Sequence, residues 1–273
     1  MSAFPIKLFK AYLFSHIHLA ICGSIFYWFL TKIFVFEAIS PYYFGGMVFL
    51  FYNLCDFLGI IGKDNKDMTE NQIWIARNMT ELVIAMFFCA LFIIWLFPSY
   101  ANLFLYPMPL YIAAGIYILP NSPLRRNIYL KPTIIPFIWV LLPLLINAES
   151  IHWSGQFASN LKFLLIFFLF VFNLCIYYDA KDIAVEDEHS MYKVIGANKI
   201  GIISLLSAAL IAALLYTNQD KSSLFLIPFI CLQNLILFLS RNINNALWHL
   251  LITDGFLGLI GIYYFTLQLL KLI

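Results

Sequence analysis

Three carboxylates stand at regular spacing just after a long apolar stretch. Asp179, Asp182 and Glu186 are three and four residues apart, so a helix that continued through them would present all three on one face. Carboxylates that converge repel one another unless a cation lies between them, and Mg²⁺ prefers a few carboxylates with phosphate oxygens and water. The spacing therefore indicates a magnesium site. The alternative is a solvated helical extension whose acids face water.

A second polar segment follows an earlier apolar stretch. Asn53 and Asp56 lie near the end of that stretch, where polar side chains are costly and are functional candidates by default. Lys63 and Arg77 follow closely. A diphosphate held by magnesium between two acidic segments would use such cations to bind its remaining oxygens. The alternative for residues 63–67 is an ordinary solvated turn.

Two further polar residues are candidates for a functional site. Tyr178 stands directly before the three carboxylates and is a candidate for a pocket wall. Asp254 lies about two turns into the last apolar stretch, where a carboxylate must face protein or water. Asp254 would either complete a polar pocket or pair with a neighbour for structure.

The composition excludes several classes of protein. The chain of 273 residues is 63% hydrophobic and 11% charged, whereas a soluble domain usually has about 25% charged residues. The net charge of +2 and the lack of a basic run exclude a nucleic-acid binder. The five cysteines are scattered singly, so neither a zinc site nor a disulfide framework is expected. The expected partner is a lipid bilayer.

The apolar stretches predict an all-α, polytopic membrane bundle in a single domain over residues 1–273. A spanning helix needs about 20 mostly apolar residues. Nine segments satisfy or nearly satisfy this condition: 15–35, 42–62, 79–97, 101–119, 133–148, 157–178, 200–217, 222–240 and 246–270. The fifth is short and contains Pro136 and Pro143.

The basic residues predict how the spans are oriented. With a cytoplasmic N-terminus, twelve Lys and Arg residues fall on the cytoplasmic side and four on the other. This excess is the one expected for cytoplasmic loops, and it places both acidic segments on the cytoplasmic face. The cell inner membrane is the expected location.

A short sequence echo suggests two halves, about 1–125 and 126–273. Asn53-Leu54-Cys55 precedes the first acidic segment and Asn173-Leu174-Cys175 precedes the second. The two copies fall after the second and the sixth span, where a duplicated four-helix unit would place them.

Nine spans with acidic motifs after the second and sixth resemble the UbiA superfamily of intramembrane prenyltransferases. The second motif of that family is Asp-x-x-Asp-x-x-x-Asp, followed by a basic residue and an apolar run that ends in Gly. Asp179, Asp182 and Glu186 match its acids, His189 stands where a Lys is usual, and MYKVIG ending at Gly196 resembles its tail. The first motif departs from the family, because Asp56 comes one residue early.

The resemblance implies a magnesium-dependent reaction. An isoprenyl diphosphate would ionise to an allylic carbocation, which an aromatic or other lipophilic acceptor would capture. The resemblance implies Asn53, Asp56, Asp179, Asp182 and Glu186 as metal ligands, and Asp56, Asp179 and Asp182 as the catalytic residues. The implied substrate contacts are Asn53, Lys63, Arg77, Tyr178, His189 and Asp254.

Two alternatives come from other classes of protein. The first is a non-catalytic relative that binds lipid or diphosphate, which the departure in the first motif favours. The second is a small transporter in which Asn53, Asp56 and Asp254 line a path. A transporter would leave the carboxylates after the sixth span without a role.

Overall fold

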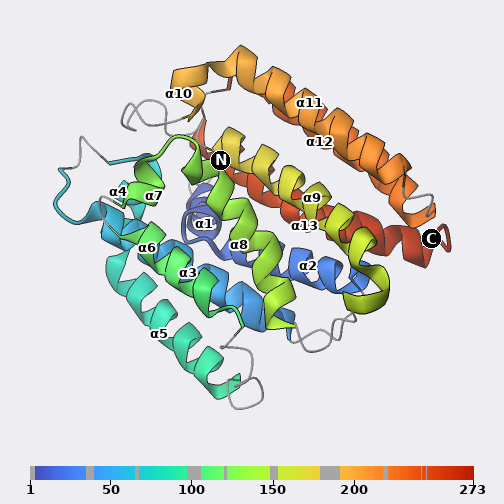
Figure 1. Cartoon of the computed structure of the whole chain (residues 1–273). Coiled ribbons are helices and arrows are strands. Elements are labelled where there is room, and N and C mark those ends of the chain that lie inside the picture. Colours follow the sequence, from blue (N-terminus) through green and yellow to red (C-terminus); the bar gives the residue numbers. More distant parts are fainter. Residues whose placement is uncertain are drawn as a thin grey trace.

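The helices of the chain form a single bundle. The computed structural model describes residues 4–34, 40–64, 68–96, 106–119, 122–147, 153–178, 191–217, 221–240, 242–243 and 245–273. Every regular element in these ranges is a helix (Figure 1). They are α1 (Phe4–Phe14), α2 (Ile17–Ile33), α3 (Pro41–Ile60), α4 (Glu70–Arg77), α5 (Met79–Leu96), α6 (Met108–Ile118), α7 (Pro123–Arg126), α8 (Leu130–Ile146), α9 (Trp153–Tyr178), α10 (Met191–Ile195), α11 (Ala197–Tyr216), α12 (Lys221–Ser240) and α13 (Ala246–Leu269).

Each of the nine predicted apolar segments overlaps one of these helices, several of which begin one to four residues earlier than predicted. Five helices are long and apolar enough to cross a membrane, and α1 with α2 forms a sixth span if the bent pair is counted as one. Three further apolar helices, α6, α8 and α12, are shorter. The all-helical class is confirmed for the described residues, with five or six helices long and apolar enough to cross a membrane; nine spans stay a prediction.

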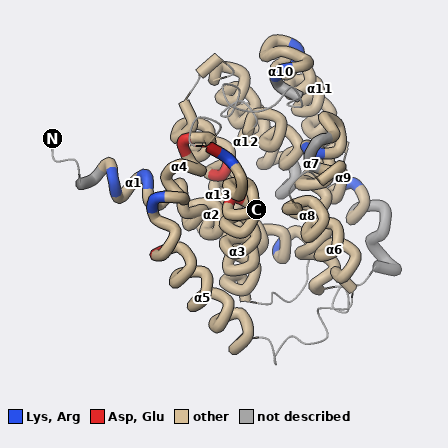
Figure 2. Tube along the Cα trace, turned by 90° about the vertical axis from the view of Figure 1, so that its left-hand side faces the viewer, with Lys and Arg blue, Asp and Glu red and all other residues tan. Residues whose placement is uncertain are grey.

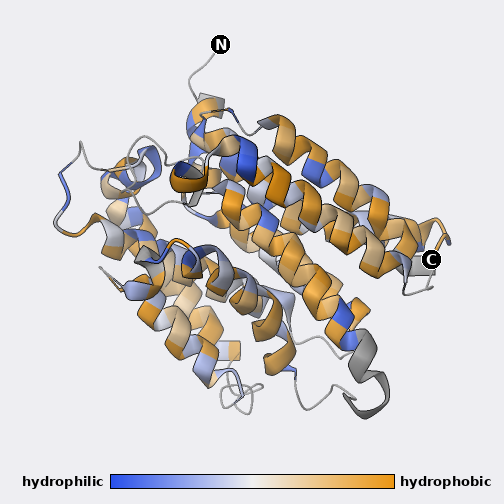
Figure 3. Cartoon of the chain, turned by 45° about the horizontal axis from the view of Figure 1, so that its top comes forward, coloured by the Kyte–Doolittle hydropathy of each residue, from blue (hydrophilic) through white to orange (hydrophobic). Residues whose placement is uncertain are grey.

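The surface of α5 is apolar and largely exposed. Along α5 only Leu82 and Ile93 are buried, and Phe88 and Trp95 are 64% and 74% exposed. Apolar colour covers the long helices on their outer sides as well (Figure 3). A contiguous apolar surface of this kind is typical of contact with lipid or with a protein partner.

The structure divides the first predicted span into two helices. The prediction begins that span at residue 15, but α1 starts at Phe4 and the chain bends by 55° between α1 and α2. His16 has a φ of 59° at the break, in the left-handed region. A break inside an apolar layer needs another partner for the backbone groups it releases. Asn53 of α3 donates from Nδ2 to the carbonyl oxygen of Ser15 at 2.9 Å.

The two polar segments, which follow α3 and α9, also contain short helices. The predicted segment after α3 includes α4, and the apolar run MYKVIG forms α10 before Gly196. Gly196 has a φ of 88°, which a residue with a side chain rarely adopts. Both Pro136 and Pro143 lie inside α8, which continues through them.

Glycines allow α13 to lie directly against α2. A Cβ added to Gly258 would lie 3.1 Å from Cys22 Sγ, and one added to Gly261 would lie 2.7 Å from Ile25 Cγ2 and 3.0 Å from the Ile25 carbonyl oxygen. Small residues at such contacts let membrane helices approach closely. The last helix of the chain is thereby joined to the first span.

We expect Gly261→Ala to destabilise the protein, because the new methyl group must displace Ile25. Overpacking of this kind costs about 1–3 kcal/mol. Thermal unfolding in detergent would measure the change. Gly115 of α6 is the matched control, since an added Cβ there meets nothing within 4 Å; Gly115→Ala should leave the unfolding temperature unchanged or raise it. An equal response of the two variants would contradict the close α2–α13 contact.

A buried polar contact joins α9, α11 and α12. Asn234 Oδ1 accepts from Asn173 Nδ2 at 3.0 Å and from Ser204 Oγ at 2.6 Å. Such bonds between helices satisfy polar groups that lipid cannot. Asn173 and Asn53, the two asparagines of the sequence echo, are both fully buried and both donate across a helix contact.

Candidate functional site

The candidate site lies at the end of the bundle that carries α4, α7 and α10. Figure 2 looks onto this end, and acidic residues gather there beside α4. Lys10 of α1 forms an ion pair with Glu70 of α4 at 2.6 Å. Both side chains are substantially exposed, so the pair contributes little to stability. The pair instead holds α1 beside the start of α4.

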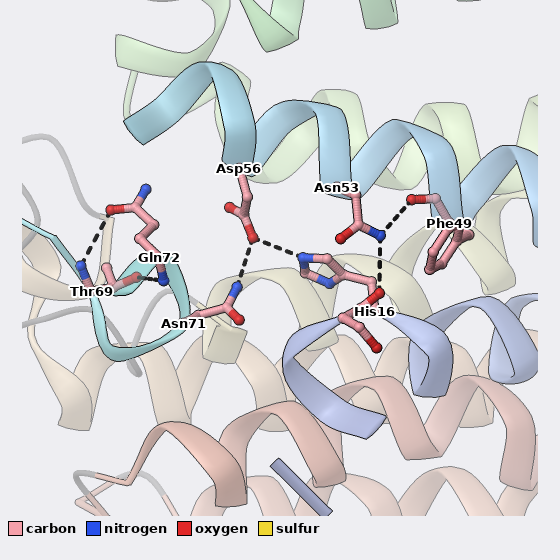
Figure 4. Close-up of polar contacts among 8 residues, drawn as sticks. His16, Phe49, Asn53, Asp56, Thr69, Asn71 and Gln72 are labelled. Atoms are coloured by element: carbon pink, nitrogen blue, oxygen red, sulfur yellow. Dashed lines mark hydrogen bonds and ion pairs between the residues drawn. The ribbon is translucent and has the colours of Figure 1, made fainter. Parts of the chain in front are cut away.

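Asp56 is held by residues from two other elements. His16 Nε2 lies 2.8 Å from Asp56 Oδ2, and Asn71 Nδ2 donates to the same oxygen at 2.6 Å (Figure 4). The His16 side chain is 2% exposed and that of Asp56 is 19% exposed. A side chain from the helix break and one from α4 therefore converge on the carboxylate that the sequence singled out.

The start of α4 is shaped so that Asn71 reaches Asp56. Thr69 Oγ1 accepts from the backbone N–H of Gln72, and Gln72 Oε1 accepts from the backbone N–H of Thr69, both at 3.2 Å. This reciprocal pair is a capping box, which satisfies two donors at a helix start. Asn71 lies between the two capping residues and is itself buried.

Two hydrogen bonds donated by the side-chain nitrogen of Asn53 fix the orientation of its carboxamide group. Nδ2 donates to the carbonyl oxygens of Ser15 and Phe49, each at 2.9 Å. The carboxamide oxygen Oδ1 is buried and has no hydrogen-bond partner. In Figure 4 it lies on the side of Asn53 that faces His16 and Asp56. Asn53 thus supports the helix break and still offers an acceptor atom.

Several other buried polar atoms around this group are unpaired. Ser15 Oγ, His16 Nδ1 and Asn71 Oδ1 have no hydrogen-bond partner. A buried polar atom without a partner costs about 1–3 kcal/mol. Unpaired atoms that gather in one place are typical of a site that binds something.

Tyr52, one helical turn before Asp56, lies where several helices meet. Its ring centroid is 5.6 Å from that of His16, and its hydroxyl oxygen accepts from Trp139 Nε1 of α8 at 3.0 Å. Trp139 belongs to α8, which packs along α9.

Asp254 belongs to this interior and not to the lipid-facing surface. Its side chain is buried in α13, which packs against α2 and α9. His249, about one turn earlier, contacts the Ile243 carbonyl oxygen through Nε2 at 2.5 Å. Both roles of Asp254, in a polar pocket and in a structural pair, stay predictions.

The last helical residue before the second acidic segment lies at the same end of the bundle. Tyr178 ends α9 and packs against the buried cluster of Leu13, Phe14 and Leu250, as does Trp74 of α4. The predicted ligands and contacts Asp179, Asp182, Glu186 and His189 lie outside the described residues.

The predicted metal ligands can be tested in part against this geometry. Within the described ranges no group of three His, Cys, Asp or Glu side chains could hold a metal. The first motif offers a single carboxylate, Asp56, with the unpaired Oδ1 of Asn53. These oxygens suit Mg²⁺, which is often held by one or two carboxylates plus phosphate oxygens. Lys63 and Arg77 are exposed at this end.

Sequence reasoning missed His16 and Asn71. A histidine within an apolar span is a functional candidate for the same reason as an aspartate, and the run Thr69–Gln72 carries the capping-box pattern. Either signal could have added these residues to the candidates. Compared with family models, curated proteins and solved structures, the chain matches none of them.

Proposed function

We propose that this protein is a magnesium-dependent prenyltransferase, which moves an isoprenyl group from an isoprenyl diphosphate to an aromatic or other lipophilic acceptor. One observation carries the proposal: Asp56, an acid of the first predicted motif, lies in a buried group of polar side chains with His16 and Asn71. The unpaired carboxamide oxygen of Asn53 is part of the same group.

The roles follow from the resemblance to the UbiA superfamily. Asn53 and Asp56 supply oxygen ligands from one helix, and Asp179, Asp182 and Glu186 supply them from the other. Bound magnesium would stabilise the negative charge that grows on the departing diphosphate. Lys63, Arg77 and His189 are proposed to bind its outer oxygens, and Tyr178 and Asp254 to contact substrate.

The interior next to the site suits a reactive carbocation. Phe26, Phe170 and Trp139 pack close to one another in the core. Aromatic faces stabilise cations, and an apolar interior excludes the water that would capture the carbocation first.

The proposal also includes the topology of the chain in the membrane. If the bent pair of α1 and α2 counts as one span and the three shorter apolar helices also cross, nine spans result. The N-terminus and both acidic segments would then lie on the cytoplasmic side of the inner membrane.

Purified full-length protein mixed with farnesyl diphosphate should release inorganic diphosphate when Mg²⁺ is present. Excess EDTA should abolish the release, and added Mg²⁺ should restore it, because the metal stabilises the leaving group. A coupled diphosphatase and phosphate assay would measure the rate. Binding of farnesyl diphosphate without release would favour the non-catalytic alternative.

One observation favours the transporter alternative. Broken spans next to buried charged residues form ion and substrate sites in secondary transporters, and the break at His16 lies beside Asp56. Cys55 is next to Asp56 and forms no disulfide. A transporter predicts that a membrane-impermeant maleimide reaches Cys55 from both membrane faces, whereas the prenyltransferase predicts access from the face of the acidic segments.

A further inference from the structure

The break between α1 and α2 lies beside both predicted ligands of the first acidic segment. We propose that this break, together with the start of α4, positions Asn53 and Asp56 to bind a divalent cation. His16 and Asn71 are the positioning residues, and neither belongs to the predicted motifs. This inference rests on the proposed function for its view that Asn53 and Asp56 are ligands.

Both positioning residues contact one oxygen of Asp56. His16 Nε2 lies 2.8 Å and Asn71 Nδ2 lies 2.6 Å from Asp56 Oδ2. An ionised carboxylate only accepts hydrogen bonds, so both nitrogen atoms donate, and hydrogen bonds to a charged acceptor are the strong ones. Two donors on one oxygen fix the direction of the carboxylate group. Because a carboxylate can accept about four interactions, these two bonds are compatible with a cation on the same group.

The two donors are themselves held by their surroundings. His16 is 2% exposed and lies at the helix break, where its φ of 59° is in the left-handed region. Asn71 is buried between the two residues of the capping box at the start of α4. The ion pair of Lys10 with Glu70 holds this start beside α1. A shift of either donor therefore requires a shift of the helix end that carries it.

The same break orients Asn53. The carbonyl oxygen of Ser15, the residue before His16, accepts from Asn53 Nδ2 at 2.9 Å. The Asn53 side chain is fully buried, and its Oδ1 has no hydrogen-bond partner. In Figure 4 this oxygen lies on the side of Asn53 that faces His16 and Asp56. An unpaired buried acceptor that faces a carboxylate indicates that a cation or a hydrogen-bond donor binds there.

The chemistry of these atoms selects a hard divalent cation. A carboxylate oxygen and a carboxamide oxygen are ligands that suit Mg²⁺ and Mn²⁺. Hydrogen-bonded partners orient the carboxylates that bind metals, and loss of such a partner typically lowers metal affinity by about 10–100-fold. The orientation of Asp56 should therefore determine how tightly the cation is held.

Binding of Mn²⁺ to the full chain in detergent tests the proposal, because Mn²⁺ takes the same oxygen ligands as Mg²⁺. The EPR signal of free Mn²⁺ measures the binding, and Asp56→Asn defines the part of it that needs the carboxylate. His16→Ala and Asn71→Ala should each weaken that part by about 10–100-fold. His16→Gln should restore most of the affinity, because the side-chain nitrogen of Gln can donate in place of the imidazole nitrogen.

His18→Ala is the matched control. His18 is also buried in α2, but its Nδ1 lies 2.8 Å from the hydroxyl oxygen of Tyr12 and not from Asp56. This variant should lose stability, as His16→Ala does, and should keep the Mn²⁺ affinity of the natural sequence. Thermal unfolding shows that each variant is folded at the temperature of the binding measurement.

Unchanged or tighter Mn²⁺ binding in His16→Ala and Asn71→Ala overturns the proposal, as does binding that Asp56→Asn leaves intact. Equal losses of affinity in His16→Ala and His18→Ala also overturn it, because they would reflect a general disturbance of α2. If His16→Ala does not fold, Asn71→Ala decides in the same way. Mn²⁺ binding that depends on the positioning residues, without magnesium-dependent diphosphate release, supports the proposal and defeats the proposed function.

Discussion

Asp182→Ala should abolish magnesium-dependent diphosphate release while the protein still folds. In the proposed function Asp182 is the middle carboxylate of the second motif, and its loss removes a ligand that positions positive charge against the leaving group. Removal of one such stabilising group typically lowers the rate by about 10²–10³-fold. The release assay with farnesyl diphosphate measures the loss, and thermal unfolding measures the fold.

Asp187→Ala is the matched control for this result. Asp187 lies in the same acidic segment but outside the three positions that match the family motif. It should retain activity close to that of the natural sequence. Full activity in Asp182→Ala would rule out the magnesium assignment, and an equal loss in both variants would point to the charge of the whole segment.

Asp56→Leu should destabilise the protein strongly. The substitution removes the oxygen that accepts from Asn71 and contacts His16, and it leaves two buried nitrogen atoms without a partner. Each loss costs about 1–3 kcal/mol. The expected total of about 2–6 kcal/mol is a large part of the stability of an ordinary domain. Thermal or denaturant unfolding in detergent provides the measurement.

The double variant Asp56→Leu with Asn71→Leu distinguishes a lost hydrogen bond from lost packing. Apolar replacement of both partners removes the unpaired amide, so the double variant should be more stable than the sum of the single effects predicts. Strictly additive effects, or an Asp56→Leu protein as stable as the natural sequence, would show that the contact contributes nothing.

Most of the fold could be predicted from local sequence. Each of the nine predicted segments overlaps a helix, because in an apolar solvent a chain must satisfy its backbone groups internally. The length of the apolar runs was sufficient for that conclusion. Even α8 continues through Pro136 and Pro143, which membrane helices tolerate when neighbours satisfy the released groups.

The candidate site could be predicted only in part. The cost of placing Asn53 and Asp56 in an apolar layer singled them out, and both lie in one connected group of hydrogen bonds. Their partners could not be read from spacing, because His16 precedes Asp56 by 40 residues and Asn71 follows it by 15. The magnesium, substrate and orientation assignments remain predictions.

The amino-acid sequence alone indicated apolar surroundings, the helical class and the approximate place of each long helix, because all three depend on runs of neighbouring residues. Tertiary structure decided where the first span breaks, since nothing near His16 in sequence forces a bend and the Ser15 carbonyl finds its partner on α3. It also decided that Tyr52 of α3 meets Trp139 of α8. Contacts between distant helices depend on how whole helix surfaces fit together, and no local pattern records that fit.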